Sequence, residues 1–467
     1  MRRNSFRKSR ISGGGVFLLL LISVYQGIAS PRYRFRVYLN TKGEAGYCVD
    51  QPEAFLSAEA IDRRERMGIA IEADDWPIAP AILDQLSRTG VKPILTSKWM
   101  QTVVVESEDY GVEQTLRQLP MVDSVRFVWQ GEPTTPLDRA KSGERLTPTK
   151  EPKKSSYGYA LEQIKLLNGL KLHRAGFRGQ GMRVAVIDAG FLNADRMCVF
   201  DSLHLLGTYN VVSPEQSVFA EDEHGTKVLS CLAANAPGWM VGTAPEASYW
   251  LIKSEDSRSE YPIEEDYYVA ALEFADSVGV AVITSSLGYF SFDVDSLSYT
   301  HDDLDGRTAF ISRAAHRAVE KGLLLFSSAG NEGNGTWEKI TFPADTEGVL
   351  TVGSVTSQKE RSRFSSKGLT ADGRIKPDLV ALGSGSCVVI GSGEISYGSG
   401  TSFATPILAG MSICLWQALP QLTPQELIDL LRQSGSQAER PDAELGYGQP
   451  NVYKAYKKGK KYAKKSH

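Results

Sequence analysis

Five short, continuous apolar segments constrain the fold of this chain more than any other feature. They are Arg183–Ile187, Ser248–Ile252, Val280–Thr284, Leu323–Phe326 and Val349–Val352. Unbroken apolar strands of this length suit a sheet that is buried on both faces. Helical stretches, such as Glu264–Ser277 and Thr308–Lys321, lie between them. The alternation predicts an α/β domain over residues 157–455, with a doubly wound, mostly parallel sheet.

Residues 32–130 form a smaller predicted unit with a different pattern. Its strand-like segments are Tyr33–Asn40, Met100–Glu106 and Val122–Trp129, and its helical segments are Ser57–Met67, Ala81–Thr89 and Val112–Leu119. Strands interleaved with helices over about 100 residues predict a small α+β unit.

Residues 131–156 join the two units. They are rich in Pro, Thr, Ser, Lys and Glu and contain almost no large apolar side chain. Such a segment cannot bury enough surface to offset its ordering entropy, so we expect a mobile linker. In an exported protein, a mobile linker is a natural cleavage site.

The first 29 residues have the order of a signal peptide. Five basic side chains precede the apolar run Val16–Val24, and small residues follow at Gly27 and Ala29. The run is far shorter than the roughly 20 residues of a spanning helix. We expect cleavage after Ala29 and export to the periplasm or the medium, with an uncleaved anchor as the alternative.

The net charge and the cysteine content limit the kinds of partner and cofactor that we expect. The formal net charge of −3 gives no reason to expect nucleic acid. The tail, residues 456–467, is rich in lysine, which predicts either a solvated end or contact with an anionic cell envelope. Five cysteines are too few for a disulfide scaffold, and none has zinc-ligand or nucleophile spacing. Cys231 and Cys414 lie in apolar helical stretches and are interpreted as buried thiols.

Two residues are candidates for an acid–base pair. Amide hydrolysis needs a nucleophile, a base, a group that orients the base and donors for the oxyanion. Asp188 ends the strand V-A-V-I, where a carboxylate could orient an imidazole. His224 begins the helix H-G-T-K-V-L-S-C-L, and Gly225 allows another backbone to approach its ring. Taken singly, Asp188 could cap a loop and His224 could be structural.

A nucleophile and an oxyanion donor are predicted further along the chain. Ser402 lies in G-S-G-T-S-F-A-T-P before an apolar helix, so its N–H would fall in the first helical turn. Asn331 follows the strand L-L-L-F-S-S, and its amide could point at the same space. The alternatives are a helix cap for Ser402 and a turn residue for Asn331.

A substrate-binding segment is predicted at Ser286, Leu287 and Gly288, which end the strand V-A-V-I-T. Its backbone could pair with an extended peptide, and an ordinary glycine turn is the alternative.

Together, these motifs resemble those of the subtilase family. The order Asp, His, Ser is the order in subtilisin, unlike that of chymotrypsin or the α/β-hydrolases. Further matching segments are Gln163-Ile164-Lys165, Arg363-Phe364-Ser365-Ser366, Lys376-Pro377-Asp378-Leu379 and Gly446-Tyr447-Gly448. Three positions depart from the family pattern, namely Ala189, Lys227 and Leu382, and none of them removes a catalytic group.

The resemblance implies an exported serine endopeptidase that acts on protein or peptide substrates. It also implies that residues 32–130 are a pro-domain that inhibits the enzyme and is released by a cut near Lys150–Ser155. We expect a monomer, with no cofactor, metal or reducing agent needed for the chemical step. A structural calcium ion is common in relatives, but Asp302–Gly306 fails the usual loop pattern because His301 takes the first place.

Two other classes of function are alternatives to a serine endopeptidase. A catalytically inactive subtilase could serve as a binding or scaffold protein. A lipase or esterase would need G-x-S-x-G with the serine before its acid and histidine, whereas Ser402 comes last. The chain has no H-E-x-x-H motif, which argues against a zinc metallopeptidase.

Overall fold

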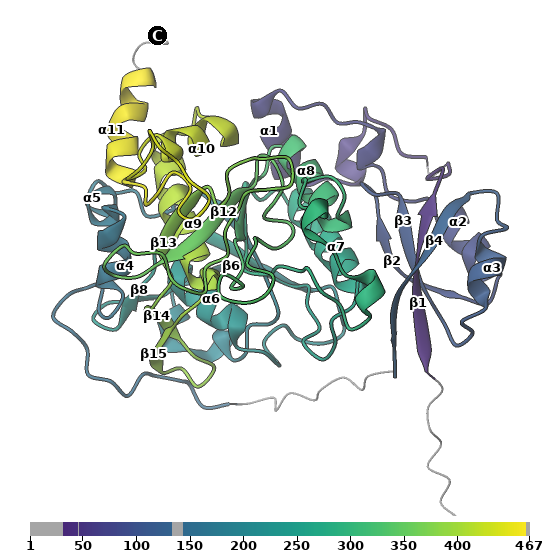
Figure 1. Ribbon diagram of the computed structural model, residues 1–467, viewed down its shortest axis with the longest axis horizontal. Helices are drawn as coiled ribbons and strands as arrows, with labels where there is room; N and C mark the ends of the chain where they lie inside the picture. The colour runs from purple at the N-terminus through teal and green to yellow at the C-terminus, as the bar shows by residue number, and fades with distance from the viewer. Residues whose placement is uncertain (1–30, 45, 133–142, 464–467) are drawn as a thin grey trace, which may run out of the picture.

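The computed structural model describes residues 31–44, 46–132 and 143–463. The predicted signal peptide lies outside these residues, as does part of the predicted linker, residues 133–142. The described chain forms a large unit built on a seven-stranded sheet and a small unit built on a four-stranded one (Figure 1).

The large sheet is parallel throughout, as the apolar segments predicted. Its strand order is β13-β12-β11-β10-β5-β9-β6. The strands are β5 (Arg183–Asp188), β6 (His204–Asn210), β9 (Ser248–Lys253), β10 (Val282–Ser285), β11 (Leu324–Ser328), β12 (Leu350–Val355) and β13 (Leu379–Leu382). Two small hairpins, β7 (Asn235–Ala236) with β8 (Met240–Val241) and β14 (Ser386–Val389) with β15 (Ile395–Gly398), lie outside it.

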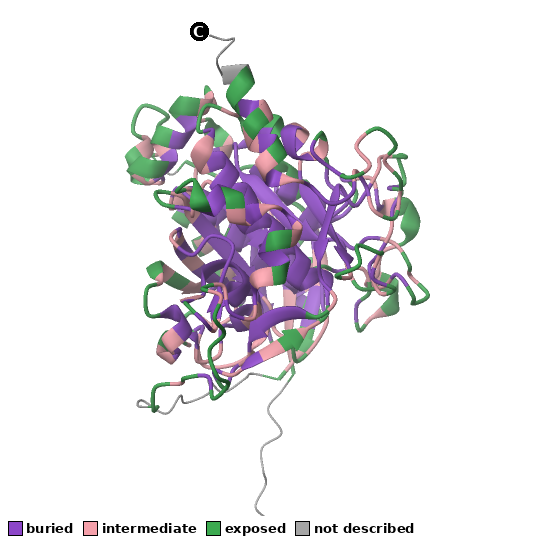
Figure 2. Ribbon diagram, turned by 90° about the vertical axis from the view of Figure 1, so that its left-hand side faces the viewer, coloured by how far each residue is buried: buried purple, intermediate pink, exposed green. Residues whose placement is uncertain are grey.

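Helices cover both faces of this sheet, and the burial of alternate residues explains why. Val184 and Val186 pack with the layer of α6 and α9, whereas Ala185 and Ile187 pack with the layer of α7 and α8. Buried residues therefore gather around the sheet (Figure 2). The helices are α4 (Leu161–Leu166), α5 (Gly169–Arg174), α6 (His224–Ala233), α7 (Ile263–Ser277), α8 (Phe310–Glu320), α9 (Thr401–Ala418), α10 (Pro424–Arg432) and α11 (Val452–Ala463).

The small unit is an antiparallel sheet with helices on one face. Its strands, in the order β2-β3-β1-β4, are β1 (Arg32–Leu39), β2 (Lys92–Ser97), β3 (Thr102–Ser107) and β4 (Val122–Gly131). Phe35 and Val37 pack against α2 (Pro80–Ser87) and α3 (Val112–Leu116). Arg34, Arg36 and Tyr38 therefore face the large unit, because side chains alternate along a strand.

The contact between the units is polar and buried. Arg36 of β1 is fully buried, and its guanidinium donates two hydrogen bonds of 2.7 Å to Asp266 of α7. In α1 (Ala58–Met67), Arg64 donates to Asp75 at 3.0 Å and to Asp276 of α7 at 2.9 Å. The two sets of ion pairs attach the small unit near the start and near the end of α7.

The described half of the linker does not match the expectation of mobility. Leu146 exchanges backbone hydrogen bonds with the segment around Met197, and Lys153 N–H donates to Gly238 at 2.8 Å. The Lys150 ammonium donates to the carbonyl of Ile395 at 2.7 Å. An extended backbone can form these hydrogen bonds without large apolar side chains. The low hydrophobicity of the linker therefore did not reveal that this half is docked on the large unit.

The first part of the lysine-rich tail is helical, and Lys457, Lys460 and Lys461 are exposed on it. Helix α11 runs through the predicted boundary at residue 456 and continues to Ala463. Tyr456 packs against Phe177, with ring centroids 5.5 Å apart. The first part of the tail is therefore the end of a docked helix.

The cysteines form no disulfide among the described residues. All five cysteines are free thiols, and Cys231 and Cys414 are buried as expected. Burial raises the pKa of the Cys231 thiol well above its usual range. Among the described residues, no helix combines the length and apolar character of a membrane span.

Candidate active site

A cleft of about 350 Å³ opens at the carboxyl edge of the large sheet. This is where ligands bind in open α/β sheets, beside the strand at which the order of connections reverses. Here that strand is β5, which lies between β9 and β10. The residues from the sequence analysis that line the cleft are His224, Ser286, Leu287, Gly288, Asn331 and Ser402.

Asp188 lies behind His224 and is fully buried. The imidazole Nδ1–H donates to Asp188 Oδ1 at 2.7 Å, which leaves Nε2 as the free ring nitrogen. Ala189 N–H donates to the same carboxylate oxygen at 2.9 Å. A Cβ atom on Gly225 would lie 2.9 Å from Asp188 Cβ and 2.3 Å from the carbonyl of Gly190. The glycine therefore permits the close approach of α6 to β5 that this hydrogen bond needs.

The electrostatics of the pair favour a protonated imidazole. Burial by itself lowers the pKa of His224, but the charge of Asp188 and its hydrogen bond outweigh that effect. Asp222 and Glu255 add to the raising effect, and the pKa of His224 rises to about 9.

Ser402 lies in the first turn of α9, where helical N–H groups lack intrahelical partners. Its side chain is oriented by the residue that follows β10, since Ser402 Oγ donates to the carbonyl of Ser286 at 3.3 Å. Ser286 Oγ in turn donates to the carbonyl of Ser402 at 2.8 Å. Within the described residues, no hydrogen bond joins Ser402 to His224. Catalytic hydrogen bonds often form only when substrate is bound.

Asn331 is fixed by the start of α9. Its Oδ1 accepts hydrogen bonds from Thr401 N–H at 2.9 Å and from Thr401 Oγ1 at 3.0 Å. Because the oxygen is engaged on that side, the Nδ2 donor group is left for the cleft that Asn331 lines.

Thr341 also lines the cleft, and the sequence analysis did not single it out. Its hydroxyl is buried and has no hydrogen-bond partner. A Cβ atom on Gly288 would lie 2.2 Å from Thr341 Oγ1, so the close packing of these two residues favours glycine at position 288.

The three departures from the family pattern leave these groups in place. Lys227 forms an ion pair at 2.5 Å with Glu223, the residue just before α6. Leu382 is buried as the last residue of β13. Ala189 keeps the backbone donor that contacts Asp188.

The acidic segment Asp302–Gly306 caps the chain that follows it, since the Asp305 carboxylate accepts hydrogen bonds from the backbone N–H groups of Arg307 and Thr308.

Three glutamates beside the cleft were also missed. Glu255 lines it, and Glu260 and Glu264 lie next to Glu255. Burial, together with the charges of acidic neighbours, raises the pKa of all three carboxyl groups. The spacing E-x4-E-x3-E before an apolar helix could have drawn attention to them, although such runs often form solvated helix starts.

The fold and the cleft define a class of α/β proteins that carry a carboxylate, an imidazole and a hydroxyl at one edge of a parallel sheet. Comparison with known proteins identifies the family. Residues 179–448 match the Subtilase family, and residues 34–144 match the Peptidase S8 propeptide domain of Bacteroidota. Since the first match covers more than half of the chain, this protein belongs to the Subtilase family.

Relatives and solved structures agree with this result. Subtilisin E of Bacillus subtilis is 29% identical over 285 residues, 60% of this chain and 66% of its own length. Subtilisin of Bacillus pumilus is 28% identical, over 60% of this chain and 92% of its own length. The epidermin leader peptide processing serine protease of Staphylococcus aureus has the same fold. Its TM-score is 0.61 and its identity 16%, over 91% of this chain and 98% of that one.

Proposed function

We propose that this protein is a serine endopeptidase in which Ser402 is the nucleophile, His224 the base and Asp188 the group that orients the base. The observation that carries the proposal is the 2.7 Å hydrogen bond from His224 to the buried Asp188, in the cleft that Ser402 also lines. A carboxylate in this position selects one tautomer of the imidazole and stabilises its cation.

In the proposed reaction, Ser402 Oγ attacks the carbonyl carbon of the substrate while its proton passes to His224 Nε2. This requires the hydroxyl to leave the carbonyl of Ser286, from which it is now 3.3 Å away. The oxyanion accepts hydrogen bonds from Ser402 N–H and Asn331 Nδ2. His224 then protonates the leaving amine, and water hydrolyses the acyl-enzyme by the reverse sequence of proton transfers.

The proposed substrates are proteins or peptides in extended conformation. The end of β10 and the residues after it, Ser286, Leu287 and Gly288, line the cleft beside Ser402. A main chain at such an edge binds an extended peptide through backbone hydrogen bonds, which depend little on the side chains of the substrate.

We further propose that the chain is an exported precursor that works as a monomer. Residues 1–29 would be removed on export, and residues 32–130 would form the inhibitory pro-domain. The propeptide match ends at residue 144, and residues after 145 are bonded to the large unit. These facts favour a cut in the linker before Leu146 over one near Lys150–Ser155. The mature enzyme would contain the peptidase domain, residues 157–455, and the lysine-rich tail, residues 456–467.

The test is labelling with a fluorophosphonate probe, together with a peptide-hydrolysis assay. Ser402→Ala should abolish labelling and lower hydrolysis by several orders of magnitude while the protein stays folded. Ser412→Ala is the matched control, because its hydroxyl lies in the same helix and bonds only to Leu408 within it. If the mature wild-type protein neither reacts with the probe nor hydrolyses peptides, a binding or scaffold role is the better proposal.

A further inference from the structure

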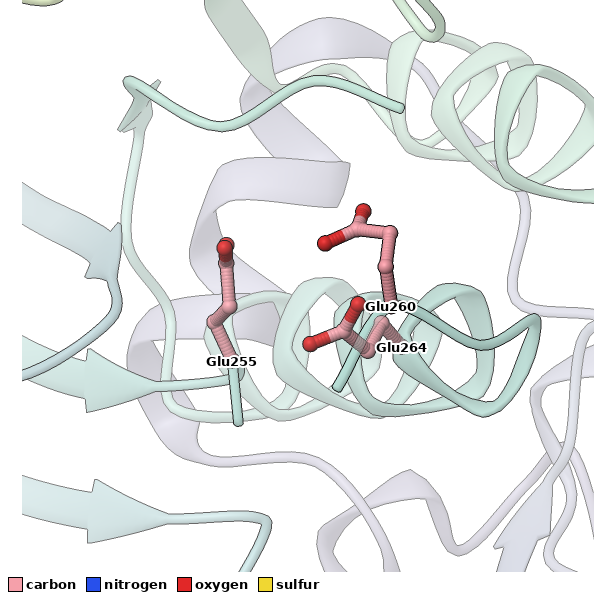
Figure 3. Close-up of side chains that lie close together, drawn as sticks. All are labelled: Glu255, Glu260 and Glu264. Atoms are coloured by element: carbon pink, nitrogen blue, oxygen red, sulfur yellow. The ribbon is translucent and has the colours of Figure 1, made fainter. Parts of the chain in front are cut away.

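Glu255, Glu260 and Glu264 converge beside the cleft (Figure 3). Glu255 and Glu260 belong to the loop between β9 and α7, and Glu264 lies in the first turn of α7. One carboxylate oxygen from each residue lies within 4.8 Å of those from the other two. Three like charges at this spacing repel one another, so the arrangement needs an explanation.

Nearby lysine and arginine side chains do not neutralise these three charges. Lys253 pairs with Glu221, and Arg258 pairs with Asp256. Throughout residues 31–44, 46–132 and 143–463, no lysine or arginine forms an ion pair with Glu255, Glu260 or Glu264. The cluster therefore carries up to three negative charges, and the single charge of His224, which acts on Glu255, does not balance them.

Glu264 supplies an independent indication of a ligand. Its side chain is almost fully buried, with 1% exposure. Oε1 accepts a hydrogen bond from Asp256 N–H at 3.1 Å, but Oε2 is buried without any partner. A buried carboxylate oxygen without a partner is costly, so a group that satisfies it would stabilise the fold.

The spacing of the oxygens identifies the class of ligand. Calcium–oxygen distances are about 2.3–2.6 Å, so two oxygens on opposite sides of one ion lie roughly 4.6–5.2 Å apart at most. Oxygens that all lie within 4.8 Å of one another can therefore contact a single ion of this kind. All of the donors are hard oxygens, which favours Ca²⁺, Mg²⁺ or Mn²⁺ over softer metals. Two of the three ligands come from a loop and one comes from a helix, so a regular octahedral arrangement is not expected. Ca²⁺ tolerates irregular geometry better than Mg²⁺ does.

We propose that Glu255, Glu260 and Glu264 bind a divalent cation, best Ca²⁺, beside the active cleft. The ion would tie the loop after β9 to the start of α7 and fix Glu255 at the edge of the cleft. Glu255 already accepts a hydrogen bond from Tyr289 at 3.4 Å, and Asp293 accepts from Glu260 N–H at 3.1 Å. The ion would stabilise the fold and take no part in the bond-breaking step, so the proposal does not rest on the proposed function.

The experiment uses full-length Ser402→Ala protein, which cannot cleave itself by the proposed mechanism. After treatment with a chelator, Ca²⁺ binding is measured by calorimetry and the melting temperature is followed as Ca²⁺ is added. We expect binding at one site and a melting temperature that rises with Ca²⁺, since a ligand that binds only the folded state stabilises it. Mg²⁺ should bind more weakly.

Matched variants on the same background locate the site. Glu264→Gln and Glu255→Gln should each weaken Ca²⁺ binding by about tenfold or more, because the number of charged ligands sets the affinity. Glu255 is only half-buried, so its variant remains informative if Glu264→Gln fails to fold. Asp302→Asn, in the other acidic segment, should bind Ca²⁺ like the parent.

Three outcomes would overturn the proposal. Parent protein that binds no Ca²⁺ excludes the site, and glutamine variants that bind like the parent place the ion elsewhere. If Ca²⁺ has no effect and Glu255→Gln, in the active enzyme, selectively slows cleavage of arginine-containing peptides, the cluster binds a basic substrate side chain.

Discussion

At the scale of single residues, the hydrogen bond between Asp188 and His224 determines when the base can act. It is the main influence that raises the pKa of His224 to about 9, against the opposing effect of burial. An imidazole accepts the proton of Ser402 only when it is neutral. At neutral pH most of the enzyme would therefore hold the base in its protonated form.

The pH–rate profile tests this consequence. kcat/KM should rise about tenfold per pH unit below pH 9 and level off above it, because the neutral imidazole is the active form. Asp188→Asn should move the midpoint to lower pH while strongly reducing the rate, since it removes the charge that raises the pKa. A wild-type profile that is already flat at pH 7 would mean that Asp188 does not raise the pKa of His224 to about 9.

Asn331 is expected to act on the transition state alone. Asn331→Ala should lower kcat by roughly 10²–10³ with little change in KM, a figure known for the corresponding donor in subtilisin itself. Steady-state kinetics on a peptide substrate separate the two constants. A higher KM at unchanged kcat would mean that Asn331 only binds substrate.

At the scale of elements, the linker and its docked half govern how the precursor would mature. Residues 146–153 are paired with the large unit through backbone and lysine hydrogen bonds. A protease needs its substrate in extended form within its cleft. A cut at Lys150–Ser155 would first require these hydrogen bonds to break.

We therefore expect the mature N-terminus to lie between residues 131 and 146. Purified wild-type protein should yield it on N-terminal sequencing, and Ser402→Ala made without other proteases should remain one chain. If the mutant is cut at the same bond and rate, another enzyme carries out maturation. A mature N-terminus at Lys150–Ser155 would refute the shift in position but leave self-cleavage intact.

At the scale of the whole molecule, buried ion pairs connect the small and large units. Arg63 and Arg64 of α1 both pair with Asp276 of α7, and Asp75 completes the group. Removing one partner from such a group leaves a buried charge uncompensated, which typically costs about 3–5 kcal/mol. The same pairs would set how long a cleaved pro-domain stays attached.

Arg64→Ala should accordingly loosen the small unit. In full-length Ser402→Ala protein, we expect faster hydrogen exchange in α1 and greater protease sensitivity of residues 32–130. Arg66→Ala is the control, since Arg66 lies in the same helix but is exposed. Equal exchange in the two variants would mean that the buried pairs do not govern docking.

Local sequence determined most of the elements of this protein. Continuous apolar runs predicted five of the seven strands of the large sheet, because a strand covered on both faces must be apolar along its length. The edge strands β6 and β13 were not predicted. At the start of α10, Thr423 and Glu426 cap each other, an arrangement that the local sequence alone encodes. The short motifs around Asp188, His224 and Ser402 predicted which residue types would meet at the sheet edge, since parallel strands all end there.

Tertiary structure alone decided the rest. β2 contains Pro93 and was not predicted, because its pairing with β3 defines it more than its own residues do. The docking of the linker, the ion pairs of α1 and the meeting of Glu255, Glu260 and Glu264 all join segments whose approach no local pattern encodes. Charged side chains look like solvent-facing residues in a sequence. Their burial becomes visible only when the fold brings their partners, or their like charges, together.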